Sequence, residues 1–178
     1  MQVQFQVALT RGSRFVKQTF IQRNFFKMKI IFTTVSLVLL SFIANAQQAE
    51  DSIRTTIINL FTAMKNGDAS LARSVFSDSA LLQTLSRDKE GKTIVRTENA
   101  ADFVQLVGSL KKDSADERIS FETIRVDGPL AIVWTPYHFY YNGRFSHCGV
   151  NSFQLVRFEG VWKIQYLIDT RRRQGCNP

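Results

Sequence analysis

Two closely spaced turn signals constrain the fold of this chain more than any other feature of its sequence. Asn142-Gly143 and Glu159-Gly160 separate three segments, 130–141, 144–157 and 161–170, that are rich in β-branched and aromatic residues. Both central positions of a type I′ turn need positive φ, which Asn-Gly provides at low cost. The pattern predicts three consecutive antiparallel strands joined by tight hairpins.

Counting outward from two-residue turns predicts which side chains share a face of the sheet, because side chains alternate along a strand. The first turn pairs Tyr140 with Phe145 and, further along, His138 with His147. The predicted face carries Leu130, Ile132, Trp134, His138, His147, Asn151, Phe153, Leu155, Trp162, Ile164, Tyr166, Ile168 and Thr170. This face is apolar at one end and polar at the other, which is typical of a partly covered ligand pocket.

The register could fail at Pro136 and at Gly149. Proline cannot donate to the strand ladder, and glycine favours a bulge that reverses the faces of all residues beyond it. The face on which Asp169 lies depends on such a bulge. Strand parity places its carboxylate on the face opposite His147, and a bulge at Gly149 would bring the two together.

The N-terminal part of the chain has the pattern of an export signal. Met28-Lys29 precedes an apolar run over 30–43, which is short for a membrane span, and Ala44-Asn45-Ala46 has the small-x-small pattern of a cleavage site. We expect residues 28–46 to be a signal peptide, and the protein to be periplasmic or secreted. An uncleaved anchor is the alternative.

Residues 1–27 are basic and contain no acidic residue. They are either an upstream start assigned in error or a long basic extension of the signal. We expect residues 47–178 to form a single domain, with no membrane span left after signal cleavage.

The net charge of +8 belongs largely to the N-terminal segment. Six of the 23 Lys and Arg residues and none of the 15 Asp and Glu residues lie in 1–46, so the remainder carries +2. This balance does not support a nucleic-acid-binding surface, and we expect no nucleic-acid partner. The one remaining basic cluster, Arg171-Arg172-Arg173, is either a solvated chain end or an anion-attracting pocket mouth.

Export would place Cys148 and Cys176 where a disulfide is permitted. The predicted register sets Cys148 opposite Arg171, and Cys176 lies roughly 16 Å further along an extended strand. Two free or buried thiols are therefore favoured. A bridge would require the tail to turn back, which Gly175 allows.

The segments before the hairpins alternate between helical and strand-like patterns. Helices are expected over 51–66, from 68 to about 77, and over 99–110; short strands are expected over 80–85, 93–96 and 119–126. Helices segregated at one end of an antiparallel sheet define an α+β fold, and the helices would cover the apolar face.

This order resembles the NTF2-like, or SnoaL-like, cone fold, in which a curved antiparallel sheet wraps around three N-terminal helices. Within that superfamily the chain resembles small exported bacterial proteins grouped as lumazine-binding or nuclear transport factor 2 family proteins. The matching segments are Asn66-Gly67-Asp68, Phe76–Ala80, Phe145–Val150, Trp162–Ile164 and Asp169–Arg171. The resemblance implies the fold and leaves the reaction open, because this fold hosts enzymes, binding modules and transport factors.

Five residues are the candidates for contacts with a small, heterocyclic ligand. We expect His147 and Asn151 to supply polar contacts, with His138 opposite, and Trp134 and Tyr166 to form the wall. The protein is then a binding protein, or a lyase or isomerase in which His147 is the general base. The aromatic residues also fit an ordinary core, and each histidine also fits a buried ring bonded to the backbone. We expect no cofactor, and no metal, since two histidines lack a third ligand.

The opposite sheet face is a candidate contact surface. It carries Val133, Tyr137, Phe139, Val150 and Leu167 in the predicted register. Exposed apolar patches commonly mark contacts between proteins. NTF2-like domains commonly dimerise through this surface, so we expect a homodimer or, as a third alternative for function, a protein-interaction subunit.

Overall fold

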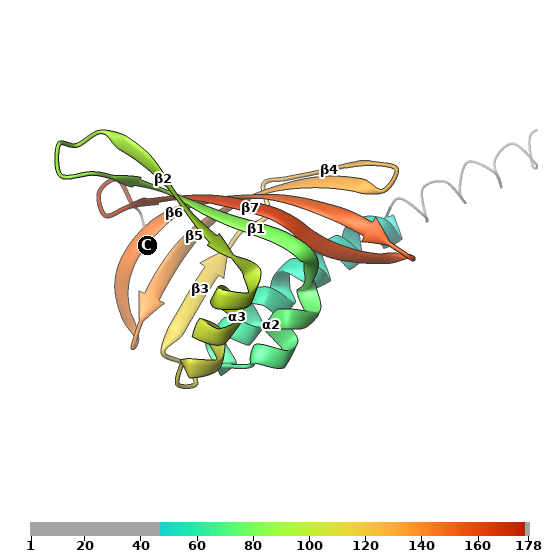
Figure 1. The fold of residues 1–178 in the computed structure, drawn as a ribbon, viewed down its shortest axis with the longest axis horizontal. Coiled ribbons are helices and arrows are strands. Elements are labelled where there is room, and N and C mark those ends of the chain that lie inside the picture. Colours follow the sequence, from blue (N-terminus) through green and yellow to red (C-terminus); the bar gives the residue numbers. More distant parts are fainter. Residues whose placement is uncertain (1–46, 177–178) are drawn as a thin grey trace, which may run out of the picture. The chain divides into compact units, whose positions relative to one another are not determined.

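Seven strands form a single sheet in the computed structural model, which describes residues 47–176 (Figure 1). Residues 47–66 are helical, followed by α2 (Ala69–Val75), β1 (Phe76–Arg87), β2 (Thr93–Asn99), α3 (Ala100–Ser109), β3 (Ala115–Ile119), β4 (Thr123–Asp127), β5 (Leu130–Tyr141), β6 (Arg144–Phe158) and β7 (Val161–Arg172). The predicted signal peptide, 28–46, and the extension, 1–27, lie outside the described residues.

The helices begin and end at the residues that the sequence indicated, with small shifts. The Asp68 side chain caps α2 by accepting from the backbone N–H of Leu71, and Asn99 caps α3 in the same way. Gly67, at φ +67°, ends the first helix. None of the helices in the described part of the chain has the length and hydropathy needed to cross a membrane.

The sheet has the order β2-β1-β7-β6-β5-β3, with β4 also pairing with β5. Both predicted hairpins form, and their turn residues Asn142, Gly143, Glu159 and Gly160 have positive φ. The α+β cone is confirmed, with one change. Because β1 pairs with β7 in parallel, the sheet is mixed, whereas the prediction was purely antiparallel.

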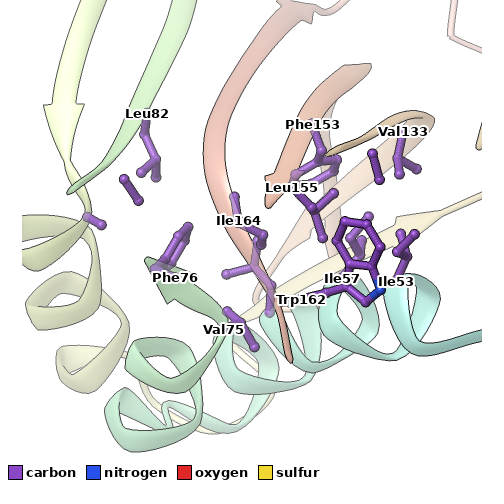
Figure 2. Packing of buried hydrophobic residues seen from close by; sticks show 14 of the residues in the cluster. Ile53, Ile57, Val75, Phe76, Leu82, Val133, Phe153, Leu155, Trp162 and Ile164 are labelled. Atoms are coloured by element: carbon purple, nitrogen blue, oxygen red, sulfur yellow. The ribbon is translucent and has the colours of Figure 1, made fainter. Parts of the chain in front are cut away.

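The helices pack against one face of the curved sheet, called the inner face below (Figure 1). Ile53 and Ile57 of the first helix meet Phe153 and Leu155 of β6 in the main core, and all four are fully buried (Figure 2). The Phe61 ring meets the Phe153 ring edge-on at 6.3 Å. Burial of this apolar area is the main stabilising term of the fold.

A bulge at Ser146 makes the predicted register of β5 and β6 wrong beyond the first two pairs. Tyr140 pairs with Phe145 as predicted, but Phe139 then pairs with His147, leaving Ser146 as the extra residue. His138 therefore lies opposite Cys148. The bulge reverses the faces along β5, so the inner face carries Val133 and Tyr137 (both 2% exposed) in place of Trp134 (44% exposed).

A second bulge, at Gln165, displaces β7 relative to β6. Leu155 pairs with Ile164 as predicted, but Gln154 pairs with Tyr166, so Asn151 faces Asp169 and not Ile168. The extra residue is stabilised by its side chain, because the Gln165 Oε1 accepts a hydrogen bond from the Ser77 hydroxyl at 2.8 Å. This bulge turns Tyr166 to the outer face and Asp169 to the inner face.

The predicted strand over 119–126 is two strands, β3 and β4, which both pair with β5. Between them the backbone N–H of Ser120 donates to the Pro136 carbonyl oxygen at 3.0 Å. The last three residues of the charged segment over 111–117 belong to β3 and are partly or fully buried.

Cys148 and Cys176 form a disulfide, with their Cα atoms 5.9 Å apart, so the expectation of two free thiols is wrong. The expected distance of roughly 16 Å applied to a tail that continues as an extended strand. In the structure Cys148 lies opposite Arg172, and residues 173–175 bend, with Gly175 at φ +67°. The tail thus reverses and brings the two sulfur atoms together.

We expect the C148S/C176S double substitution to lower the free energy of unfolding by about 2 to 4 kcal/mol, because the disulfide restricts the unfolded chain over a sequence separation of 28 residues. Urea unfolding followed by tryptophan fluorescence measures the change. Dithiothreitol should produce a similar loss in the unmodified protein and none in the double variant. Equal stability of the oxidised protein and the variant would contradict the expectation.

Candidate ligand-binding site

Two neighbouring rows of side chains cross the inner face of the sheet. The first row is apolar on β5, β6, β7 and β1: Val133 of β5 pairs with Phe153 of β6, and Phe153 with Leu167 of β7. Leu167 pairs with Leu82 of β1, which pairs with Glu98 of β2. The helices cover most of this row, so it belongs to the main core.

The second row lies two residues further along each strand and is polar. It joins Thr135 of β5 to Asn151 of β6, Asp169 of β7, Thr84 of β1 and Arg96 of β2. Thr135, Asn151 and Asp169 are buried. The Thr135 hydroxyl has no hydrogen-bond partner among residues 47–176, so the row retains unused hydrogen-bonding capacity.

The Asp169 carboxylate is the centre of the polar row. The Thr84 hydroxyl donates to Oδ1 at 2.5 Å, and Arg171 Nε donates to Oδ2 at 2.8 Å. The Tyr137 hydroxyl lies 3.2 Å from Oδ2. Burial and the negative charge of Asp169 raise the pKa of Tyr137, which keeps its phenol a neutral donor. A buried carboxylate needs such partners.

Gly149 allows Tyr137 to reach this carboxylate. A Cβ atom at Gly149 would lie 2.7 and 2.8 Å from the Cε1 and hydroxyl of Tyr137, and 1.8 Å from the Thr170 carbonyl oxygen. The Tyr137 hydroxyl also donates to that same oxygen, at 2.9 Å, so its one proton is divided between the Thr170 carbonyl and the Asp169 carboxylate. Close approach of ring and backbone, and not a bulge, is therefore the role of this glycine.

Glu117 of β3 reaches the polar row from the side. Its Oε1 accepts a hydrogen bond from Asn151 Nδ2 at 2.8 Å. Burial is the main cause that raises the pKa of Glu117. The hydrogen bond from Asn151 lowers this pKa, and the nearby negative charge of Asp169 raises it. The resulting pKa of Glu117 is about 7. A carboxyl that exchanges its proton near neutral pH is a typical feature of functional sites.

A cavity of about 1060 Å³ opens above the polar row. Its floor includes Thr84, Glu117, Asn151, Asp169 and Arg171 of the sheet. Its apolar wall comes from the first helix and α3, through Leu60, Phe61, Met64, Phe103 and Leu106. The cavity is therefore amphipathic, with hydrogen-bonding groups on one side and aromatic and aliphatic surface on the other.

His147 lies in a second, smaller cavity of about 390 Å³ with Ser146 and three arginines. Its Nδ1 is 3.1 Å from the Ser146 hydroxyl, and its ring packs 4.9 Å from that of Phe139. Burial and the charge of Arg171 lower the pKa of His147, so its imidazole is neutral at physiological pH. His147 and Asn151 share the inner face but line different cavities.

The other three predicted ligand contacts lie on the outer face because of the two bulges. Trp134 is 44% exposed, and His138 lies opposite Cys148 beside the Phe145 ring. Tyr166 donates its hydroxyl proton to Gln83 Oε1 at 2.6 Å. None of these three lines the main cavity.

Thr84, Glu117 and Tyr137 were missed as site residues, whereas Arg171 was named only as part of the basic cluster over 171–173. The alternation of Ala115, Glu117 and Ile119 was visible in the sequence and could have placed Glu117 on an inner face. No local signal marks Thr84. Within residues 47–176, no group of three His, Cys, Asp or Glu side chains is arranged to hold a metal ion.

Solved structures share this fold at low sequence identity. An NTF2-like protein from Shewanella baltica OS155 is 16% identical with a TM-score of 0.56, over 71% of this chain and 96% of that one. An NTF2-like protein from Methylobacillus flagellatus KT is 16% identical with a TM-score of 0.56, over 71% and 94%. A domain with a cystatin-like fold from Nostoc punctiforme PCC 73102 is 19% identical with a TM-score of 0.55, over 71% and 78%.

These similarities to solved structures concern the fold alone, whereas a match to a family model identifies the family. A comparison with curated protein sequences finds no match. The family described as "Putative lumazine-binding" matches residues 48–165, which include both hairpin turns, the whole of β1 to β6 and the start of β7. The chain belongs to this lumazine-binding family of the NTF2-like superfamily.

Proposed function

We propose that the protein binds a small, flat heterocyclic molecule in the main cavity. One observation carries the proposal: a buried polar row faces an apolar wall across a cavity of about 1060 Å³. This volume slightly exceeds the usual range for small-molecule sites, roughly 300 to 1,000 Å³. The family description, which names lumazine, supports a fused-ring ligand.

The polar row offers the hydrogen-bonding groups that such a ring system needs. Lumazine carries N–H donors and carbonyl acceptors around two fused rings. The Asn151 amide and the Glu117 carboxyl form one donor and acceptor pair on the cavity floor, 2.8 Å apart. Phe61 and Phe103 on the opposite wall provide apolar surface for the ring faces.

We expect lumazine to stabilise the domain over residues 47–178 against thermal unfolding, and the Asn151→Leu substitution to weaken binding about tenfold or more. The leucine removes a buried hydrogen-bonding group, which is worth about 1 to 3 kcal/mol. Calorimetric titration measures the affinity. Ser152→Ala, which alters the next residue on the outer face, should bind as the unmodified protein does. Unchanged binding in Asn151→Leu, or no binding of lumazine at all, would oppose the proposal.

A proton-transferring enzyme, a lyase or isomerase, is the second candidate. The observation that favours it is Glu117, whose pKa of about 7 suits a general acid or base and which faces the main cavity. His147, the base suggested by the sequence, lines only the smaller cavity. Glu117 is therefore the better placed of the two.

We expect the free energy of unfolding to fall by up to about 3 kcal/mol as the pH rises from about 4.5 to about 7. Glu117 keeps its proton in the folded protein over this range but loses it when the chain unfolds, so deprotonation favours unfolding. Urea titrations at a series of pH values measure the slope. Glu117→Gln should flatten it, and the exposed control Glu122→Gln should leave it in place. A slope that survives Glu117→Gln would refute the assignment.

Export and dimerisation are further parts of the proposal. The predicted signal peptide, 28–46, and the Cys148–Cys176 disulfide both support an oxidising compartment. The outer face exposes Leu130, Ile132 and Trp134 of β5, each more than 40% accessible, and so supports a second copy as the partner. These residues replace the set inferred from the sequence, because Val133 and Tyr137 are buried inside the domain.

We expect native mass spectrometry of the exported protein to give a dimer of disulfide-bonded chains that begin at Gln47. Trp134→Arg should yield monomers, because it places a charge in the apolar contact. Val161→Arg, at the comparably exposed tip of the β6–β7 hairpin, is the matched control and should remain dimeric. A chain that still carries residues 28–46 would contradict cleavage, and monomers of the unmodified protein would contradict dimerisation.

A further inference from the structure

The smaller cavity has a distinct chemical character. We call it the arginine pocket, defined by Ser146, His147, Arg171, Arg172 and Arg173 around about 390 Å³. Its lining residues are three arginines, one histidine and one serine, and no acidic residue is among them. The pocket therefore presents hydrogen-bond donors and positive charge almost exclusively.

Most of this positive charge is not neutralised within the domain. Only Arg171 has a carboxylate partner in the described part of the chain, because its Nε donates to Asp169. The other oxygen of Asp169 accepts a hydrogen bond from Thr84. Among residues 47–176, the side chains of Arg172 and Arg173 form no hydrogen bond or ion pair with protein groups. Two guanidinium forks therefore remain available for a ligand.

The disulfide fixes this arrangement. Cys148 follows His147 directly, and its bond to Cys176 closes the bend over residues 173–175 that carries Arg173. Arg171 and Arg172 belong to β7 and are held by the sheet. The backbone that carries the basic residues is thus held in place before any ligand arrives, which lowers the backbone conformational entropy lost on binding.

We propose that the arginine pocket binds a tetrahedral oxyanion of the phosphate or sulfate class. Such a group accepts paired hydrogen bonds from guanidinium forks and further bonds from a hydroxyl and an imidazole. Arg171 and Arg173 line both the arginine pocket and the main cavity. The oxyanion is therefore either a free ion or the charged end of a molecule whose body occupies the main cavity. Neither alternative requires that the body be a heterocycle.

His147 reports on occupation of the pocket. Its ring packs against Phe139 and Tyr137 of β5, and the charged groups that act on it are Arg171, Asp169 and Arg173. Burial and the arginine charges lower its pKa in the empty pocket. An anion beside the ring would favour the imidazolium and raise that pKa.

NMR titration of the two histidine rings against pH, with and without inorganic phosphate at constant ionic strength, tests the proposal. We expect a saturable rise in the pKa of His147 of about one unit. His138, the only other histidine in the chain, lies on the outer face and serves as the internal reference. An unchanged pKa of His147, or an equal rise with chloride or at His138, would overturn the proposal.

Arg173→Ala should weaken phosphate binding about tenfold, the effect of losing one charge-assisted hydrogen bond. Arg125→Ala removes an equally charged, exposed residue of β4, which pairs with the opposite end of β5, and should leave phosphate binding unchanged. A similar loss in both variants would mean a nonspecific effect of net charge and would refute a defined pocket. Among residues 47–176 the Arg173 side chain forms no hydrogen bond or ion pair with protein groups, so its removal should leave the fold intact.

Phenyl phosphate distinguishes the two sources of the oxyanion. If it binds more tightly than inorganic phosphate, and Phe103→Ala in the wall of the main cavity removes the difference, the oxyanion is the end of a larger ligand. If the two probes bind equally, the pocket takes a free ion. Either result supports the arginine pocket, and both are independent of whether lumazine binds in the main cavity.

Discussion

The buried carboxylate of Asp169 is the interaction on which the polar part of this domain depends. An isolated charge in this position would be strongly destabilising, so the fold must provide donors for it. They come from three strands: Thr84 from β1, Tyr137 from β5 and Arg171 from β7. The carboxylate thus connects the parallel β1–β7 pair to the antiparallel part of the sheet, and Gly149 leaves the space that Tyr137 needs to reach it.

The two rows on the inner face separate the packed core from the floor of the main cavity. The apolar row is packed beneath the helices and supplies hydrophobic burial, with Phe153 fully inaccessible. The polar row, displaced by two residues along each strand, lies under the main cavity. Because neighbouring strands place their paired residues side by side, each kind of side chain forms a continuous band across the sheet. A rigid core therefore holds the hydrogen-bonding groups of the site in fixed positions.

Two single-residue bulges decide which side chains belong to these rows. Ser146 brings Tyr137 and Val133 inward and leaves Trp134 outside, and Gln165 brings Asp169 inward and turns Tyr166 outward. The Ser146 bulge also lies at the smaller cavity, which His147 lines together with Arg171 and Arg172 of β7. Bulges are frequent beside functional sites because one extra residue redirects every side chain that follows. Here they create both a buried anionic site and a cationic pocket next to it.

The sequence alone determined the α+β class, the approximate helix bounds, both hairpin turns and the three long C-terminal strands, because these depend on local conformational preference and short-range periodicity. It also placed Asn151 and His147 on one face, since both lie on the same side of the Ser146 bulge within β6. Only the tertiary structure decided the parallel pairing of β1 with β7, the position of Glu117, the reversed tail and its disulfide. The physical reason is that these features depend on long-range contacts and on bulges, where a one-residue shift has little local signature but reverses every face beyond it.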